Sequence, residues 1–177
     1  MADRPRKRAV VVGAGMAGLM AAAAASEAFE EVLVVEKDRL PGTPQLRKGV
    51  PQGAHVHTFL GYAVEAMDEL VPGIMDDLYA AGAVKIRRND DLWFHDAAGP
   101  TPIRDVGILT PSVTRPLLEH TTRLRVMGLA NVQLRDASRV QDFELDHHGR
   151  VVAVVVETAG ELERIGANLV MECSGRA

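Results

Sequence analysis

Three glycines and one glutamate near the N-terminus have the residue types and spacing needed to bind a phosphorylated nucleotide. Gly13, Gly15 and Gly18 form a G-x-G-x-x-G pattern inside the apolar segment 9–25, and Glu36 follows a second apolar run. In this pattern the first glycine permits a tight turn, the second lets a pyrophosphate approach the backbone, and the third lets helix and strand pack closely. The N–H groups at the start of the helix carry partial positive charge toward the phosphates. The spacing therefore predicts a dinucleotide-binding βαβ unit over residues 9–36.

Glu36 indicates which dinucleotide this unit accepts. A carboxylate at the tip of the second strand can accept hydrogen bonds from a ribose diol, and it repels a 2′-phosphate, so NADP is disfavoured here. The residues expected to contact the dinucleotide in this segment are Gly13, Ala14, Gly15, Ala17, Gly18, Glu36 and Lys37.

An N-terminal signal or membrane segment is the competing interpretation of the same stretch. The basic residues Arg4, Arg6, Lys7 and Arg8 precede the apolar run, as in a signal peptide. The regular glycines, the short apolar length and the strand that follows all disfavour this interpretation.

Composition sets further bounds on function. The net charge is −4, so the chain lacks the overall positive charge typical of proteins that bind nucleic acid or an anionic membrane. Cys173 is the single cysteine, which excludes an internal disulfide and a cysteine-based zinc cluster, and we expect it to be an inert buried thiol. Nothing else in the sequence suggests export, so we expect a cytoplasmic protein without a membrane span.

The remaining pattern of apolar residues and turn signals predicts helices, then a small antiparallel meander, then one more buried strand. The expected elements are a loop at 38–53, a helix capped by Thr58 and ended by Pro72, a helix at 74–81, strands at 84–88 and 92–95, an irregular segment at 99–113, a helix capped by Thr114, strands at 132–134, 140–145, 151–157 and 162–165, and an apolar strand at 169–173. The inner stripe of the helix after Thr114 is expected to be Leu117, Thr121, Leu124 and Met127.

This order, with its motifs, resembles the FAD-binding part of flavoprotein monooxygenases of the para-hydroxybenzoate hydroxylase type. Their superfamily also includes flavin-dependent halogenases and geranylgeranyl reductases. The resemblance rests on the glycine pattern with Glu36, on the segments 47–57 and 114–119, and on the segment 169–176. It implies an α/β, Rossmann-like FAD/NAD(P)-binding fold with a glutathione-reductase-like βαβ and an antiparallel β-meander crossover. It also implies that Arg47 and Arg115 reach the pyrophosphate or ribityl region of FAD.

The resemblance divides the chain and leaves part of the family pattern unmatched. Residues 1–177 would form the N-terminal part of an FAD-binding domain: the βαβ at 9–36, a mostly helical insertion at 54–128, the meander at 131–165 and a last parallel strand at 168–175. The family's later Gly-Asp segment, substrate-binding sheet and C-terminal helical part are not found. Glu172 and Cys173 stand where Asp and a smaller residue are usual. We therefore expect a fold that is incomplete at its C-terminus, whether a fragment, a truncated product or a split protein completed by a separate chain.

The expected function is that of the FAD-binding portion of a flavin-dependent monooxygenase or oxidoreductase, with NAD(P)H and O₂ acting on a small organic substrate. The isolated chain is not expected to be active alone. The alternatives are a truncated, non-catalytic nucleotide-binding module and an NAD-dependent Rossmann enzyme, which the meander disfavours. No catalytic residue can be assigned, because in this superfamily the flavin carries the chemistry.

Several other residues could do chemistry but have simpler interpretations. His55 and His57 alternate and could share a face, yet no third ligand sits at convincing spacing, so no metal site is predicted. They are expected to be hydrogen-bonded near the cofactor pocket or simply structural. Trp93 and Phe94 are expected to lie in the core rather than form a stacking platform.

Overall fold

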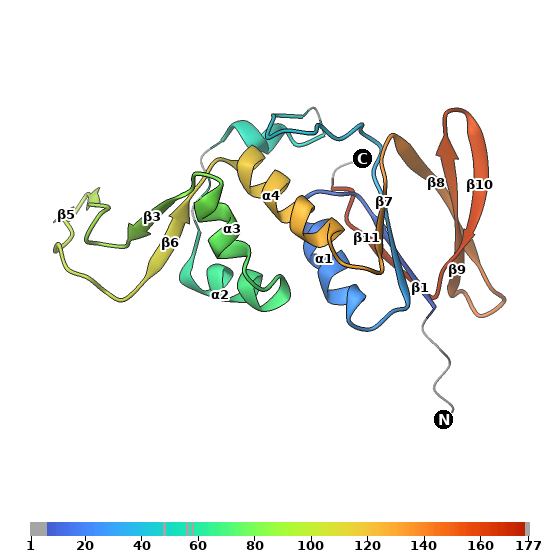
Figure 1. Cartoon of the computed structure of the whole chain (residues 1–177), viewed down its shortest axis with the longest axis horizontal. Coiled ribbons are helices and arrows are strands. Elements are labelled where there is room, and N and C mark those ends of the chain that lie inside the picture. Colours follow the sequence, from blue (N-terminus) through green and yellow to red (C-terminus); the bar gives the residue numbers. More distant parts are fainter. Residues whose placement is uncertain (1–6, 48, 56, 58, 176–177) are drawn as a thin grey trace, which may run out of the picture. The chain divides into compact units, whose positions relative to one another are not determined.

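The computed structural model describes residues 7–47, 49–55, 57 and 59–175 (Figure 1). The chain divides into two compact units, of which the first comprises the chain up to Thr43 and from Thr122 onward. The second unit is Pro44–Thr121.

The first unit is built on a four-stranded parallel sheet with the strand order β11-β1-β2-β7. Its strands are β1 (Arg8–Val12), β2 (Glu31–Val35), β7 (Val132–Arg135) and β11 (Leu169–Glu172), and α1 (Met16–Ser26) connects β1 to β2. The central strands β1 and β2 are near-continuous runs of buried valine, leucine and alanine, as expected of strands covered on both faces. The predicted βαβ unit is therefore confirmed.

A three-stranded antiparallel meander covers one face of this sheet, and α1 packs on β1 and β2 (Figure 1). The meander consists of β8 (Ser138–Leu145), β9 (Val151–Thr158) and β10 (Glu161–Gly166). Val10 and Leu33 from the sheet share one buried cluster with Val154, Val156 and Ile165 from the meander. Because side chains alternate along a strand, the neighbouring residues of β1 and β2 point to the opposite face.

The predicted meander, at 131–165, begins too early in the sequence, because its first strand belongs to the parallel sheet. β7 pairs in parallel with β2, with Val32 opposite Val132, so it is the edge strand of the parallel sheet. The antiparallel meander begins only at Ser138. A four-residue strand carries no sign of its pairing partner, and the β2 edge accepts it because the Asn131 carbonyl receives the N–H of Val32 at 2.8 Å.

The second unit contains short helices and two small antiparallel pairs of strands. Its elements are the 3₁₀ helix η1 (Pro51–Ala54), α2 (Gly61–Leu70), α3 (Ile74–Ala80), β3 (Val84–Arg87) paired with β6 (Leu109–Ser112), and β4 (His95–Asp96) paired with β5 (Gly99–Pro100). The predicted cap Thr58 lies outside the described residues, and Leu60 precedes the first residue of α2.

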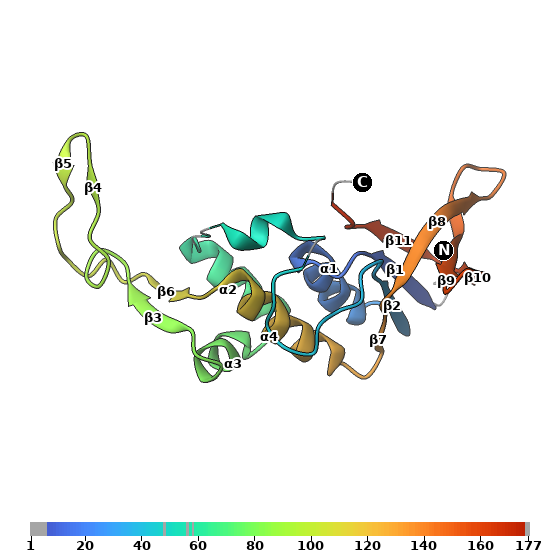
Figure 2. The same cartoon turned by 90° about the horizontal axis from the view of Figure 1, so that it is seen from above.

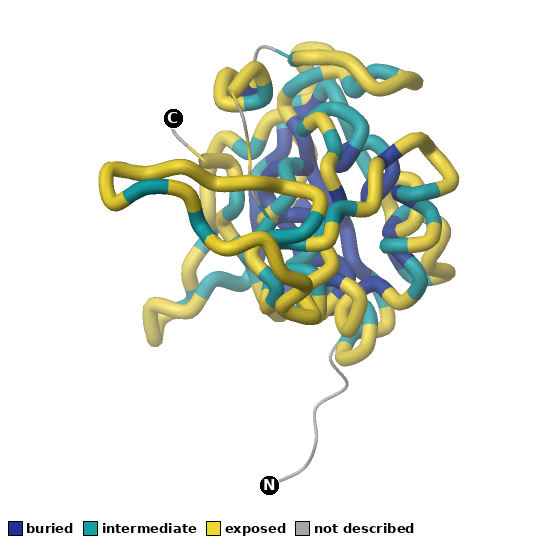
Figure 3. Tube along the Cα trace, turned by 90° about the vertical axis from the view of Figure 1, so that its left-hand side faces the viewer, coloured by how far each residue is buried: buried dark blue, intermediate teal, exposed yellow. Residues whose placement is uncertain are grey.

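Two predictions for the second unit are wrong. The segment 99–113 was expected to be irregular, yet its last residues form β6, which supplies the partner that β3 needs. Trp93 and Phe94 were expected in the core, yet Trp93 is 60% exposed and Phe94 is also exposed. Both belong to the long hairpin that carries β4 and β5 (Figure 2), and Figure 3 shows that most residues of this hairpin are exposed. An aromatic pair predicts burial only where a second layer covers it.

The helix α4 (Arg115–Met127) begins as predicted. The Thr114 hydroxyl accepts a hydrogen bond from the N–H of Leu117 at 3.4 Å, which is the expected capping contact. Pro116 occupies the first turn, where its missing N–H leaves no helical bond unmade.

The buried face of α4 differs from the predicted stripe. Leu118, Thr122 and Val126 are buried at a spacing of four residues. Of the predicted stripe, Thr121 is buried, whereas Leu124 is 61% exposed. The polar side chain of Arg123 is also buried, because it donates to the Pro41 carbonyl at 2.6 Å. The buried face therefore includes polar residues that a search for apolar spacing passes over. No helix in the described part of the chain is long and apolar enough to cross a membrane.

Candidate nucleotide-binding site

The turn after β1 requires glycine at position 13. Gly13 has a φ of 99°, a region that L side chains rarely adopt, and its N–H donates to the Val35 carbonyl at 2.7 Å. A Cβ atom here would lie 2.7 Å from the Cys173 carbonyl oxygen, so the turn also passes close to the end of β11. The expected role of Gly13, a tight turn out of the strand, agrees with this geometry.

Gly18 allows α1 to pack against the same turn. A Cβ atom at Gly18 would lie 1.9 Å from the carbonyl oxygen of Gly13, far inside van der Waals contact. The helix could not keep its position with any larger residue here. This is the close packing of helix and strand that the sequence predicts for the third glycine.

Gly15 differs from Gly13 because its backbone conformation does not need glycine. It is the N-cap of α1 with φ −77° and ψ −179°, a conformation open to any residue. No side chain caps the helix, so the first N–H groups of α1 have no capping partner from a side chain. Ala17, in the first turn, is exposed. Because no side chain caps α1 and Gly15 itself has no side chain, the backbone N–H donors at the start of the helix are accessible to an anion.

Glu36 is a buried carboxylate that ties the ends of β1 and β2 together. It is only 4% exposed, and its Oε2 accepts a hydrogen bond from the N–H of Ala14 at 2.8 Å. Its Oε1 accepts another from the N–H of Asp38 at 2.9 Å. Ala14, predicted to contact the dinucleotide, therefore donates its backbone N–H to Glu36.

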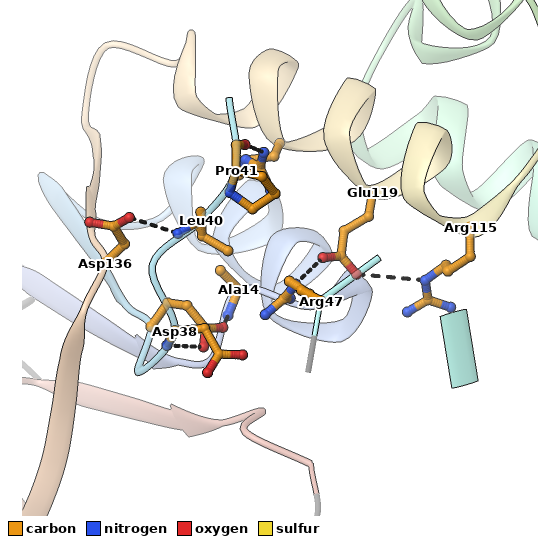
Figure 4. Close-up of polar contacts among 10 residues, drawn as sticks. Ala14, Asp38, Leu40, Pro41, Arg47, Arg115, Glu119 and Asp136 are labelled. Carbon is orange, nitrogen blue, oxygen red and sulfur yellow. Dashed lines mark hydrogen bonds and ion pairs between the residues drawn. The ribbon is translucent and has the colours of Figure 1, made fainter. Parts of the chain in front are cut away.

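The backbone that follows Glu36 is fixed by two further bonds within the first unit. The N–H of Leu40 donates to the Asp136 carboxylate at 2.8 Å, and the Arg123 guanidinium donates to the Pro41 carbonyl at 2.6 Å (Figure 4). These contacts hold the chain that leaves β2, and with it the position of Glu36.

A pocket of about 230 Å³ lies at the carboxyl ends of the parallel strands, where open α/β sheets bind their ligands. Gly13 and Glu36 line it together with Lys37. Its other lining residues are Val12, Val35, Ser138, Arg139, Val140, Phe143, Glu172 and Ser174. The contribution of β8 was not predictable from the sequence, because nothing in a meander strand marks it as lining a site.

In the second unit, Arg47 and Arg115 are brought together by a residue that the sequence analysis did not single out. The Nε of Arg47 donates to Oε1 of Glu119 at 2.7 Å, and the Nε of Arg115 lies 3.6 Å from Oε2 of the same carboxylate (Figure 4). All three side chains are largely buried. Glu119 follows Arg115 by four residues on one helix, and this spacing is a signal that could have identified it.

The two histidines that follow Arg47 in the sequence lie at the surface. His55 and His57 are exposed, and Nδ1 of His57 donates to the carbonyl of His55 at 2.8 Å. Within the described residues, no group of three or more histidine, cysteine, aspartate or glutamate side chains is placed to hold a metal ion.

Comparison with known proteins relates this arrangement to flavoproteins. A family model described as FAD dependent oxidoreductase matches residues 9–177. Protein Rv3254 of Mycobacterium tuberculosis is 36% identical over 185 residues, which cover 97% of this chain and 38% of that protein. The chain therefore spans well under half the length of this curated relative.

Two solved structures show the same fold at low identity. The myxobacterial chondrochloren halogenase CndH matches with a TM-score of 0.72 and 17% identity over 97% of this chain and 38% of its own. The p-nitrophenol 4-monooxygenase PnpA of Pseudomonas putida matches with a TM-score of 0.68 and 17% identity over 96% of this chain and 41% of its own. The predicted fold class is thereby confirmed, whereas neighbours of two different activities leave the reaction open.

Proposed function

The chain belongs to the FAD dependent oxidoreductase family, and on that premise we propose that its first unit binds the ADP moiety of FAD. The observation that carries this proposal is the pairing of an uncapped helix start at Gly15 with the buried carboxylate of Glu36. Backbone donors suit a pyrophosphate, and a carboxylate suits a ribose diol. In this proposal the two sites act on adjacent parts of one ligand.

The first turn of α1 is proposed to bind the pyrophosphate. Gly13 and Gly18 are required by the packing of the turn itself, whereas the φ and ψ of Gly15 are open to any residue. Absence of a side chain at Gly15 is then explained by the approach of the phosphate. The N–H groups at the start of α1, including that of Ala17, add the partial positive charge of the helix terminus.

Glu36 is proposed to accept hydrogen bonds from the adenosine ribose. A carboxylate can accept about four hydrogen bonds, so bonds to Ala14 and Asp38 are compatible with further bonds to a diol. The two backbone bonds hold the side chain in one orientation before the ligand arrives, which lowers the ordering cost of binding. Lys37 lines the same pocket, where the adenosine portion is proposed to lie.

Arg47 and Arg115 are proposed to bind the phosphate or ribityl region of the same cofactor. Each guanidinium uses its Nε toward Glu119, and its terminal nitrogens can donate to anionic or hydroxyl oxygens. When bound, FAD supplies the redox chemistry that amino-acid side chains lack. The residues of this chain contribute binding, orientation and electrostatics.

For the whole protein we propose a flavin-dependent oxidoreductase that uses NAD(P)H and O₂ on a small organic substrate. The family supports flavin dependence, and the neighbours include a monooxygenase and a halogenase. A non-catalytic nucleotide-binding module is the alternative for this chain alone, since it spans 38% of its curated relative. We also propose that the protein is soluble and cytoplasmic and that a separate chain completes its FAD-binding fold.

A ligand panel on the purified chain tests the proposed binding. Isothermal titration with FAD, ADP, AMP, FMN and the 2′-phosphorylated NADP should show binding of the first three and weaker binding of the last two. FMN lacks the adenosine that the pocket is proposed to hold, and the 2′-phosphate would meet the Glu36 carboxylate. Equal affinity for FMN and FAD, or preference for NADP, would contradict the proposal.

A further inference from the structure

Glu119 stands out in the second unit because it is a buried carboxylate between two arginines. It is 5% exposed on α4, and each of its two oxygens faces a different guanidinium. One arginine comes from the loop at Arg47 and the other from the first turn of α4 (Figure 4). Taking a charge out of water is costly unless partners compensate it, so this arrangement needs a reason.

Both arginines contact Glu119 through Nε and not through the terminal nitrogens. A guanidinium carries five N–H donors in a fixed plane, so a contact at Nε sets the direction of the others. The carboxylate therefore sets the orientation of both guanidinium planes.

One contact in the cluster is incomplete. Within the described residues, the buried atoms Nε of Arg115 and Oε2 of Glu119 have no hydrogen-bond partner, and their separation is 3.6 Å. At this distance Glu119 attracts the Arg115 guanidinium without a hydrogen bond, so its contact with Arg115 is weaker than its contact with Arg47.

We propose that Glu119 is a positioning residue that holds Arg47 and Arg115 as a pair for the pyrophosphate–ribityl segment of the cofactor. This inference rests on the proposed function, in which the two arginines bind FAD. Without Glu119 the guanidinium groups would repel each other and lose their common direction. Glu119 itself acts through the arginines and contacts no ligand in this account.

Glu119→Gln tests the proposal, because glutamine keeps the shape and removes the charge. The dissociation constant for FAD should rise by about tenfold, whereas that for AMP should stay unchanged, because AMP lacks the segment concerned. Circular dichroism must show the helix content of the parent chain, because a disturbed second unit could weaken FAD binding without affecting the AMP site proposed in the first unit. Glu119→Asp keeps the charge and should recover part of the FAD affinity. The matched control is Glu65→Gln, at an exposed position on α2 of the same unit, which should bind both ligands like the parent chain.

A second readout does not depend on any ligand or on the stability of a variant. The Nε–H of Arg47 is buried and bonded to a carboxylate, so its proton should exchange slowly and give a distinct ¹H–¹⁵N signal in the parent chain. Absence of a protected arginine Nε–H signal would overturn the proposal. So would FAD binding by Glu119→Gln equal to that of the Glu65→Gln control.

The arginines themselves separate failure of this inference from failure of the proposed function. If Arg47→Gln and Arg115→Gln bind FAD as tightly as the parent chain, their proposed role in cofactor binding is wrong. If both weaken FAD binding and Glu119→Gln does not, only the positioning role is wrong. If all three weaken it, the effects of Glu119→Gln and Arg47→Gln should be strongly non-additive in the double variant.

Discussion

Replacing Glu36 by glutamine should destabilise the first unit even when no ligand is present. Two backbone N–H groups, those of Ala14 and Asp38, donate to the two carboxylate oxygens at 2.8 and 2.9 Å. A glutamine oxygen can accept one of these bonds, and its NH₂ group then faces the other donor. Leaving one buried donor unpaired costs about 1–3 kcal/mol, so the free energy of unfolding should fall by about that amount.

Glu36→Ala removes both acceptors, so it should lower the free energy of unfolding by more than Glu36→Gln. Ala14 is fully buried and Asp38 only partly so, which places the expected loss at about 2–4 kcal/mol. Urea denaturation followed by circular dichroism measures both losses, and Glu27→Gln, at the exposed end of α1, is the control. If Glu36→Gln unfolds within about 0.5 kcal/mol of the parent chain, the structural role assigned to this carboxylate is refuted.

The remaining predictions concern the glycine turn and the thiol. Gly18→Ala should lower the free energy of unfolding by about 1–3 kcal/mol or more, because its Cβ would lie 1.9 Å from the Gly13 carbonyl oxygen. Gly42→Ala is the control, because the space around Gly42 is open and its free energy of unfolding should not fall. Thermal unfolding compares the two variants. Burial, and then the negative charge of Glu172, raise the pKa of Cys173, so its alkylation by iodoacetamide should be slower than for the unfolded chain at pH 7.5 and should increase only at higher pH. Glu172→Gln removes one cause, so it should lower this pKa and shift the rate profile to lower pH; an unchanged profile would contradict the assignment.

The βαβ unit was predictable because its signals are local. The strand, the glycine pattern and the following strand are contiguous in sequence, and the fold needs Gly13 and Gly18 for steric reasons that any such turn shares. The meander strands were also predictable from alternation and turn residues. Pairing between distant segments was not, as the assignment of β7 to the parallel sheet and the existence of β6 show.

The residues of the candidate site were also predictable only where the signal lies within a short stretch of sequence. The pattern identified Gly15 and Glu36, but it gave no sign that Glu36 also accepts two backbone N–H groups. Arg47 and Arg115 were identified through the resemblance alone. Their meeting at Glu119 depends on the path of the loop at Arg47, which spacing along α4 does not specify.

The affinity of the chain for FAD with and without a side chain at Gly15 tests the central claim most directly. Gly15 has a backbone conformation open to any residue, so Gly15→Val should leave the helix content largely intact. The valine would occupy the space proposed for the pyrophosphate, and titration should show loss of FAD and ADP binding. Gly42→Val, in an exposed loop with open space around it, should bind both like the parent chain. Undiminished FAD and ADP affinity in folded Gly15→Val would contradict the account.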